Sequence, residues 1–136
     1  MTSIEEKFVF KQKVDIRWGD MDALRHVNNA MYMTYLEQGR IDYLSEVCGW
    51  DWTKNQGLIL AKATLSFLSP LFYGDHPDLY IRCSRIGNKS FELAYRMVKE
   101  KDTNVLEANT VLVVYDYQLN CSVPIPENIK SKLKKA

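Results

Sequence analysis

The hydrophobic and polar positions in the first third of the chain change their period once. Apolar residues alternate with polar ones in parts of 8–18, which predicts a β-strand with one face turned inward that stops at Gly19. From Ala30 onward the apolar positions recur at the three- and four-residue spacing of a helix. The residues of this stripe are Tyr32, Leu36, Gly39, Tyr43 and Val47. The pattern predicts one strand followed by one long helix.

The remainder of the chain has the pattern of an antiparallel sheet. Four β-rich runs are separated by short turn sequences, of which residues 87–90 are the clearest hairpin signal. The runs cover residues 58–69, 79–86, 91–100 and 105–119. After Pro126, residues 127–135 are expected to form a short basic helix whose lysines face solvent. We therefore predict an α+β fold in a single domain over residues 1–136, with a curled antiparallel sheet wrapped around one long central helix.

Glycine and asparagine residues add detail to the predicted helix. Gly39 lies on its buried stripe, where glycine costs about 1 kcal/mol relative to alanine, so we expect it to let the helix approach the sheet closely. Asn28 or Asn29 can cap the N-terminus, and Gly49 follows the end. The helix should therefore begin near Ala30 and lie at the centre of the fold.

Composition narrows the function classes. A chain of 136 residues with 46% hydrophobic and 26% charged residues is typical of a soluble globular protein, and a net charge of +1 gives no overall field for a nucleic-acid partner. We see no secretory signal and no run long enough to cross a bilayer, so we expect a cytoplasmic protein without a membrane partner. Cys48, Cys83 and Cys121 are too widely spaced for a disulfide framework, and with two histidines they offer little material for a metal site.

The densest chemistry lies between the predicted strand and the predicted helix. Asp20 and Asp22 follow the strand, and His26, Asn28 and Asn29 precede the helix. A helix N-terminus carries free backbone N–H groups and partial positive charge, which suits a developing oxyanion. The alternative is an Asp- and Asn-rich turn with a helix cap, and this structural role fits Asp20 best. We take the stretch as the candidate site.

Several short motifs follow one another in a specific order. They are Asp20-Met21-Asp22, then Tyr32, Tyr35, Glu37 and Arg40 on the helix, Ser69-Pro70, Tyr73-Gly74-Asp75, Lys89-Ser90-Phe91 and Pro124-Ile125-Pro126. In this order they resemble the hotdog-fold thioesterases, specifically the 4-hydroxybenzoyl-CoA thioesterase-like group. Residues 26–29, His-Val-Asn-Asn, are also similar to a motif of plant acyl-carrier-protein thioesterases. The resemblance implies hydrolysis of an acyl-CoA thioester without a metal or organic cofactor, in a homodimer or a homotetramer built from dimers.

The resemblance also implies roles for individual residues. The family's catalytic carboxylate matches Asp22, which would attack the thioester carbonyl or deprotonate a water, and the carbonyl-polarising amide falls at Asn28 or Asn29. In the plant relatives an Asp, an Asn and a His act together, and here Leu24 stands where that Asn would be. His26 would orient a water or protonate the leaving thiolate, or alternatively bond to the turn backbone. The candidate catalytic residues are therefore Asp22, His26 and Asn29.

The substrate-binding candidates come from several elements. Tyr32 and Thr64 are expected to line the acyl pocket, and Asn28 to cap the helix and shape the site. Lys89 and Ser90 match family positions that contact the CoA nucleotide, although a solvent-exposed lysine-serine turn is the alternative.

Three questions stay open. Glu37 is a rival catalytic carboxylate, because another branch of the superfamily uses one on the central helix, but an ion pair with Arg40 or Arg17 or a contact across a dimer is the favoured role. The long strand over 58–69 would leave an edge that invites pairing with a second copy. Function itself has three rivals: an acyl-carrier-protein thioesterase, a hotdog dehydratase and a non-catalytic acyl-binding module.

Overall fold

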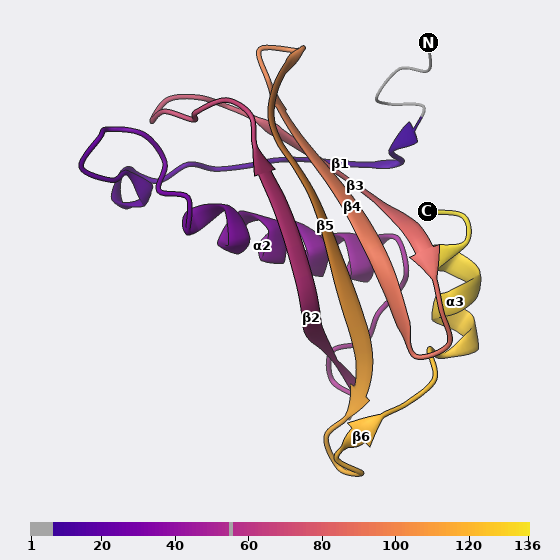
Figure 1. Cartoon of the computed structure of the whole chain (residues 1–136). Coiled ribbons are helices and arrows are strands. Elements are labelled where there is room, and N and C mark those ends of the chain that lie inside the picture. The colour runs from indigo at the N-terminus through magenta and orange to yellow at the C-terminus, as the bar shows by residue number, and fades with distance from the viewer. Residues whose placement is uncertain (1–6, 55) are drawn as a thin grey trace.

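The computed structural model describes residues 7–54 and 56–136, and Figure 1 shows the whole chain. In chain order the elements are β1 (Phe10–Lys13), the 3-10 turn η1 (Trp18–Asp20), α2 (Met31–Glu46), β2 (Gln56–Phe67), β3 (Asp78–Ile86), β4 (Ser90–Lys99), β5 (Thr103–Asp116), β6 (Cys121–Ser122) and α3 (Glu127–Leu133). The strands form one six-stranded sheet in the order β1-β3-β4-β5-β2, with β6 beside the end of β5, and every pairing is antiparallel. The predicted α+β fold class is confirmed.

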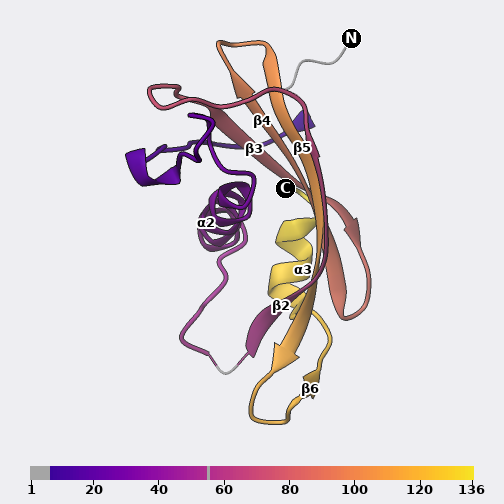
Figure 2. The same cartoon turned by 60° about the vertical axis from the view of Figure 1, so that its left-hand side comes forward.

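The helix α2 lies on the concave face of the sheet. Figure 2, which views α2 nearly along its axis, shows the strands curving around it. A Cβ atom on Gly39 would come within 2.5 Å of the Leu79 side chain and 3.1 Å of the Ile81 side chain, so only glycine allows this close approach. The prediction for Gly39 is confirmed. Gly49 follows the end of the helix, as predicted, and has a left-handed backbone with a φ of 67°.

The N-terminus of α2 differs from the prediction. Its cap position is Ala30, and no side chain caps the helix. Instead the Asn28 side chain accepts a hydrogen bond from the N–H of Ala30 at 3.0 Å, which makes a local turn one residue earlier. Asn28 therefore shapes the chain before the helix and does not cap it.

Two strand boundaries also differ from the prediction. β1 stops at Lys13, which pairs with Asp78 at the start of β3, because the preceding Pro77 has no N–H to continue the ladder. β5 stops at Asp116, whose side chain accepts hydrogen bonds from the N–H groups of Gln118 and Leu119, and the chain then turns back to form the short strand β6.

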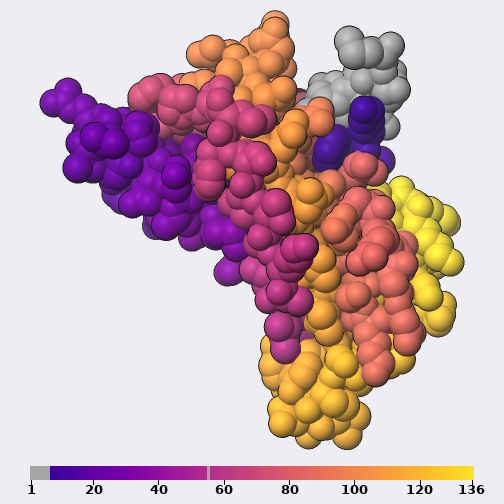
Figure 3. All heavy atoms as spheres, viewed as in Figure 1, coloured from indigo at the N-terminus to yellow at the C-terminus, as the bar shows by residue number. Residues whose placement is uncertain are grey.

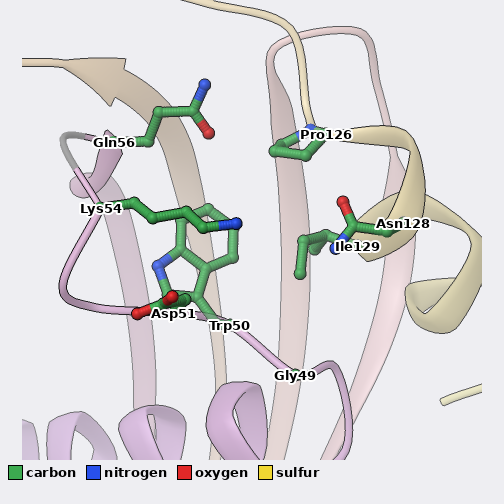
Figure 4. Close-up of a pocket in the computed structure, with 8 residues that line it drawn as sticks. All are labelled: Gly49, Trp50, Asp51, Lys54, Gln56, Pro126, Asn128 and Ile129. Carbon is green, nitrogen blue, oxygen red and sulfur yellow. The ribbon is translucent and has the colours of Figure 1, made fainter.

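The predicted C-terminal helix is present as α3, and its lysines are exposed except for the half-buried Lys130. The sequence did not indicate that Ile129 and Leu133, on its other face, belong to the main core. A small cavity of about 90 Å³ lies where α3, the start of β2 and the loop that follows α2 meet. Figure 4 shows the side chains that line it. The indole N–H of Trp50 is buried there and has no hydrogen-bond partner among the described residues. A cavity of this size has room for ordered water that would satisfy it.

The outer strand β2 is the open edge of the sheet. Its partner on one side is β5, and the described part of the chain supplies no partner on the other side. Apolar side chains on and beside it are exposed, among them Ile59, Leu60, Phe67 and Leu68. In Figure 3 the atoms of this segment run down the surface of the molecule. A long apolar edge of this kind is a template for pairing with another strand.

Candidate functional site

The loop between η1 and α2 is a closed, well-supported turn. Met21 pairs with Val27, and the N–H of Asp22 donates to the His26 carbonyl at 2.9 Å. The N–H of Arg25 donates to the Asp22 carbonyl at 3.1 Å, and Arg25 has a φ of 68°. These bonds define a three-residue hairpin loop whose last residue is left-handed. The turn holds Asp22 and His26 side by side at its base.

Asp22 and His26 form the centre of the candidate site. One Asp22 carboxylate oxygen, Oδ1, accepts a hydrogen bond from the N–H of Leu24 at 2.9 Å. The other, Oδ2, lies 3.4 Å from His26 Nδ1. Both side chains are half-buried, so they are held by the protein and still reachable by solvent or substrate. The predicted proximity of the two residues is therefore present, with one carboxylate oxygen fixed and the other beside a group that can donate or accept a proton.

Asp20 has the structural role that was predicted for it. It is 1% exposed, and it accepts hydrogen bonds from the Tyr35 hydroxyl at 2.6 Å and from the backbone and guanidinium of Arg17. Burial alone would raise the pKa of Asp20, but the hydrogen bonds from Tyr35 and Arg17 outweigh it and hold that pKa below its ordinary value. Asp20 thereby ties the loop to α2.

Removal of the Tyr35 hydroxyl should weaken the fold. We expect Tyr35→Phe to lower the free energy of unfolding by about 1.5–3 kcal/mol at pH 7, because a hydrogen bond to a buried charged group is lost. Since the pKa of Asp20 is lowered in the folded state, this stabilisation is complete above the unfolded value of about 3.9 and disappears as the pH falls through the folded value. Urea unfolding at pH 7 and near pH 3 measures both effects.

Tyr43→Phe is the matched control for that experiment. Tyr43 is buried on the same helix, but the neighbours of its hydroxyl are the Cys48 thiol and the Cys83 backbone and not a carboxylate. Its loss should therefore lower stability by about 1 kcal/mol or less, without the pH dependence of Tyr35→Phe. Equal destabilisation by both variants would contradict the proposed support of the loop by Tyr35.

A cavity of about 190 Å³ adjoins the Asp22–His26 pair. Its walls come from the loop, the first turn of α2 and the segment that follows β2. The lining residues are His26, Val27, Asn29, Tyr32, Phe67, Leu68, Ser69 and Pro70. The rings of Tyr32 and Phe67 meet edge to face with their centroids 5.2 Å apart. Polar groups from the loop thus face an aromatic wall, as expected for a site that holds an apolar group next to reacting atoms.

The two asparagines before α2 are in different environments. Asn28 has its side-chain oxygen occupied by the N–H of Ala30, whereas Asn29 lines the cavity. The backbone N–H of Asn29 donates to no acceptor in the part of the chain that the structure describes. An N–H at the start of a helix with no internal partner is the kind of donor that stabilises an oxyanion. Of the two candidate asparagines, Asn29 is the one that lines the cavity.

Three predicted substrate-binding residues lie away from this cavity. Thr64 is opposite Asn109, and both are exposed, whereas neighbouring Ala108 and Thr110 on the other face are buried. Because opposite residues share a face, Thr64 points away from α2. Simple alternation from Leu60 would have turned it inward, but a bulge between Leu60 and Lys62 reverses the faces of the strand.

The Lys89–Ser90 hairpin is at the other end of the sheet. Lys89 is exposed, Ser90 is half-buried, and the carbonyl of Asn88 accepts a hydrogen bond from Ile125, just before α3. Figure 1 shows this β3–β4 turn at the lower right and the loop before α2 at the far left. One chain by itself does not bring Lys89 or Ser90 to Asp22.

The expected ion pair of Glu37 is absent among the described residues. Glu37 is exposed and has neither Arg40 nor Arg17 within ion-pair distance, and Arg17 pairs with Asp20 instead. Arg40 is buried and donates a hydrogen bond to the Tyr95 hydroxyl. Sequence reasoning did not identify this buried arginine as a functional candidate, although its position four residues after Leu36 on the buried stripe was a signal.

Among the described residues, no three His, Cys, Asp or Glu side chains lie together as ligands for a metal ion would. No helix in the same residues has the length and apolar character needed to span a membrane.

The chain is similar in sequence to proteins that are named as thioesterases and hydrolases. A chloroplastic acyl-acyl carrier protein thioesterase of Arabidopsis thaliana, ATL3, is 28% identical over 124 residues, 88% of this chain and 65% of ATL3. A 1,4-dihydroxy-2-naphthoyl-CoA hydrolase of Thermosynechococcus vestitus is 29% identical over 126 residues, 89% of this chain and 86% of that protein. The chain spans 60% and 65% of the length of two of its curated relatives.

The solved structures include a thioesterase of Thermus thermophilus in complex with coenzyme A and Zn. It superposes with a TM-score of 0.84 and 26% identity, over 96% of this chain and 95% of that one. The hotdog fold expected from the motifs is therefore confirmed. Residues 16–133 match the sequence profile of one family, so the chain belongs to the thioesterase-like superfamily.

Proposed function

We propose that this protein hydrolyses acyl-CoA thioesters to a free carboxylic acid and CoA. The observation that carries the proposal is the Asp22 carboxylate, held by Leu24 and placed 3.4 Å from His26 beside a cavity with an unpaired helix-start N–H. Family membership and the hydrolase and thioesterase names of the relatives support the reaction type.

The chemistry needs an oxygen nucleophile and a donor for the oxyanion. In one route Asp22 takes a proton from water, and the resulting hydroxide adds to the thioester carbonyl. In the other, Asp22 itself adds, and water then hydrolyses the acyl-enzyme anhydride. The N–H or amide of Asn29 stabilises the tetrahedral oxyanion, the C–S bond breaks, and a proton from His26 or Asp22 neutralises the departing thiolate. No step requires a metal or organic cofactor.

A second copy of the chain would complete the substrate site. Because β2 has 12 residues and an open edge, antiparallel pairing about its middle sets Gln56 of one copy beside Phe67 of the other. The loop of the second copy that contains Asp22 then lies near the end of the first copy's sheet where Lys89 is located. This arrangement supports a homodimer, or a tetramer of dimers, in which the carrier and the thioester contact different chains.

One alternative rests on specific observations. The His-Val-Asn-Asn motif of residues 26–29 and the similarity to ATL3 favour an acyl-carrier-protein thioesterase. A non-catalytic acyl-binding module would keep the cavity without turnover. Thiol release from one acyl group carried on CoA and on acyl carrier protein separates the three: we expect faster release from CoA.

The proposed contact between Lys89 and the CoA nucleotide can be tested separately. Lys89→Ala should raise KM for an acyl-CoA about fivefold with little change in kcat, because Lys89 would touch the remote phosphates and not the thioester. The effect should shrink at high salt and vanish with the matching pantetheine thioester. Steady-state kinetics on both substrates test this.

Lys101→Ala is the control, since Lys101 is exposed in the turn between β4 and β5, at the other end of β4. It should leave KM unchanged. An equal loss on CoA and pantetheine substrates in Lys89→Ala would mean that Lys89 supports the fold or the assembly and not the carrier.

A further inference from the structure

Arg40 is a buried cation whose neighbours leave it largely unpaired. It is 7% exposed on the sheet-facing side of α2, and its Nη1 donates to the Tyr95 hydroxyl at 3.3 Å. Tyr95 in turn shares a hydrogen bond of 2.7 Å with Thr110, which is fully buried. In the described part of the chain the Arg40 guanidinium makes no further hydrogen bond and has no carboxylate within ion-pair distance.

The other guanidinium N–H groups keep some solvent access, so they are free to bind an acceptor that the protein itself does not provide. A guanidinium has five N–H donors in a planar fork, and a charge taken out of water is costly unless it is paired. Tyr95 cannot neutralise the charge, because burial raises the pKa of its phenol and keeps it uncharged. A carboxylate is the group whose two oxygens match the guanidinium fork.

Arg40 lines a cavity of about 240 Å³ between α2 and the β2 edge. The cavity walls are otherwise largely apolar, formed by Ile41, Trp52, Leu58, Leu60 and Leu112, with Glu37 at the solvent side. A dry cavity of about 150 Å³ can already hold a benzene molecule, so this one has room for a short acyl group. Its single cation therefore lies among apolar walls.

In the proposed pairing of two copies, this cavity would lie next to the catalytic loop of the second copy. It includes Leu58 and Leu60, near the start of β2, whereas the cavity beside Asp22 includes Phe67, at the end of β2. The antiparallel pairing of two β2 strands described above brings the start of one strand to the end of the other. The two cavities, one from each copy, then meet across the interface.

We infer that this cavity receives the far end of the acyl group and that this end carries a carboxylate, which pairs with the Arg40 guanidinium. The inference rests on the proposed function and assigns it a substrate class: thioesters of short dicarboxylic acids. Arg40 is then a specificity-determining residue, and Tyr95 and Thr110 hold it in position. Glu37 is exposed, so solvent screens its repulsion, whereas the Arg40 pair would be buried.

The test compares acyl groups that differ only at the far end. Succinyl-, glutaryl- and adipoyl-CoA are measured against butyryl-, valeryl- and hexanoyl-CoA, with the spontaneous rate of each ester subtracted. We expect kcat/KM for the best dicarboxylic ester to exceed that of its methyl-ended counterpart by at least about tenfold. Arg40→Met should abolish or invert this ratio, and Arg40→Lys, which keeps the charge without the fork, should keep part of it.

Arg85→Met is the control, because Arg85 is an exposed arginine on β3 and should leave the ratio unchanged. A wild-type preference for methyl-ended esters, or an equal effect of Arg40→Met on both classes, would overturn the inference. Thermal unfolding of each variant shows whether it is folded. If Arg40→Met does not fold, Arg40→Lys is used as the test variant in its place.

A binding measurement separates this inference from the proposed function. Calorimetry with Asp22→Asn, alone and combined with Arg40→Met, gives the affinity for the same six esters without turnover. Tighter binding of dicarboxylic esters that depends on Arg40 supports the inference even if wild-type protein hydrolyses nothing. Equal affinities for the two classes refute it even if hydrolysis is fast.

Discussion

Asp22→Asn should lower the turnover of an acyl-CoA thioester by at least about 100-fold while the protein stays folded. An amide can neither deprotonate a water nor attack a carbonyl, so both proposed routes lose their essential group. The fold should survive because the substituted side chain keeps an oxygen that can accept the hydrogen bond from Leu24 N–H, and because Asp22 is half-buried. Thiol release at saturating substrate, together with a thermal unfolding curve, measures the two quantities.

Glu37→Gln is the matched control for this variant. Glu37 is the rival carboxylate, but it is exposed about two turns into α2, away from the helix N-terminus that favours developing negative charge. Its variant should keep turnover within about tenfold of wild type. A folded Asp22→Asn protein with near-normal turnover, together with an inactive Glu37→Gln protein, would move the site onto the helix.

Specific activity should collapse when the protein is diluted below the dissociation constant of its dimer. The proposed site needs the β2 edges of two copies, and the exposed apolar side chains along that edge supply the surface to be buried. Because a dissociated chain keeps Asp22 but loses the second copy, activity per chain should fall to a small fraction. Light scattering and activity measured over the same range of concentration should show parallel transitions.

A stable monomer with full activity at nanomolar concentration would contradict the shared site. It would also remove the connection between Arg40 and the second copy's Asp22. Lys89 and Asp22 of the same chain would then have to contact one substrate molecule. The two turns that contain them lie far apart in Figure 1, which does not favour this.

Local periodicity predicted most of the fold, because each element buries one face. The stripe from Tyr32 to Tyr43 marks the buried side of α2, and the closeness of Gly39 to Leu79 follows from a residue without a side chain on that stripe. The errors and omissions lie where tertiary context decides. Pro77 ends the β1 ladder from a distant part of the chain, and α3 buries Ile129 although its sequence is rich in lysine.

The candidate site was predictable where its residues are close in sequence. Asp22 and His26 lie close together because a four-residue spacing suits a tight hairpin. Asp20 could be assigned a structural role instead, because it lies closer to the end of the predicted strand. Thr64 was misplaced because a single bulge reverses every face beyond it, and no local pattern announces a bulge. The distance between Lys89 and Asp22 within one chain depends on sheet topology, which spacing alone does not reveal.

Thiol release from a panel of acyl-CoA esters, by wild-type and Asp22→Asn protein side by side, tests the central claim most directly. Wild-type protein should release thiol well above the spontaneous rate from at least one CoA ester, and Asp22→Asn should lose this release. No release from any CoA ester by folded wild-type protein would contradict the proposed function.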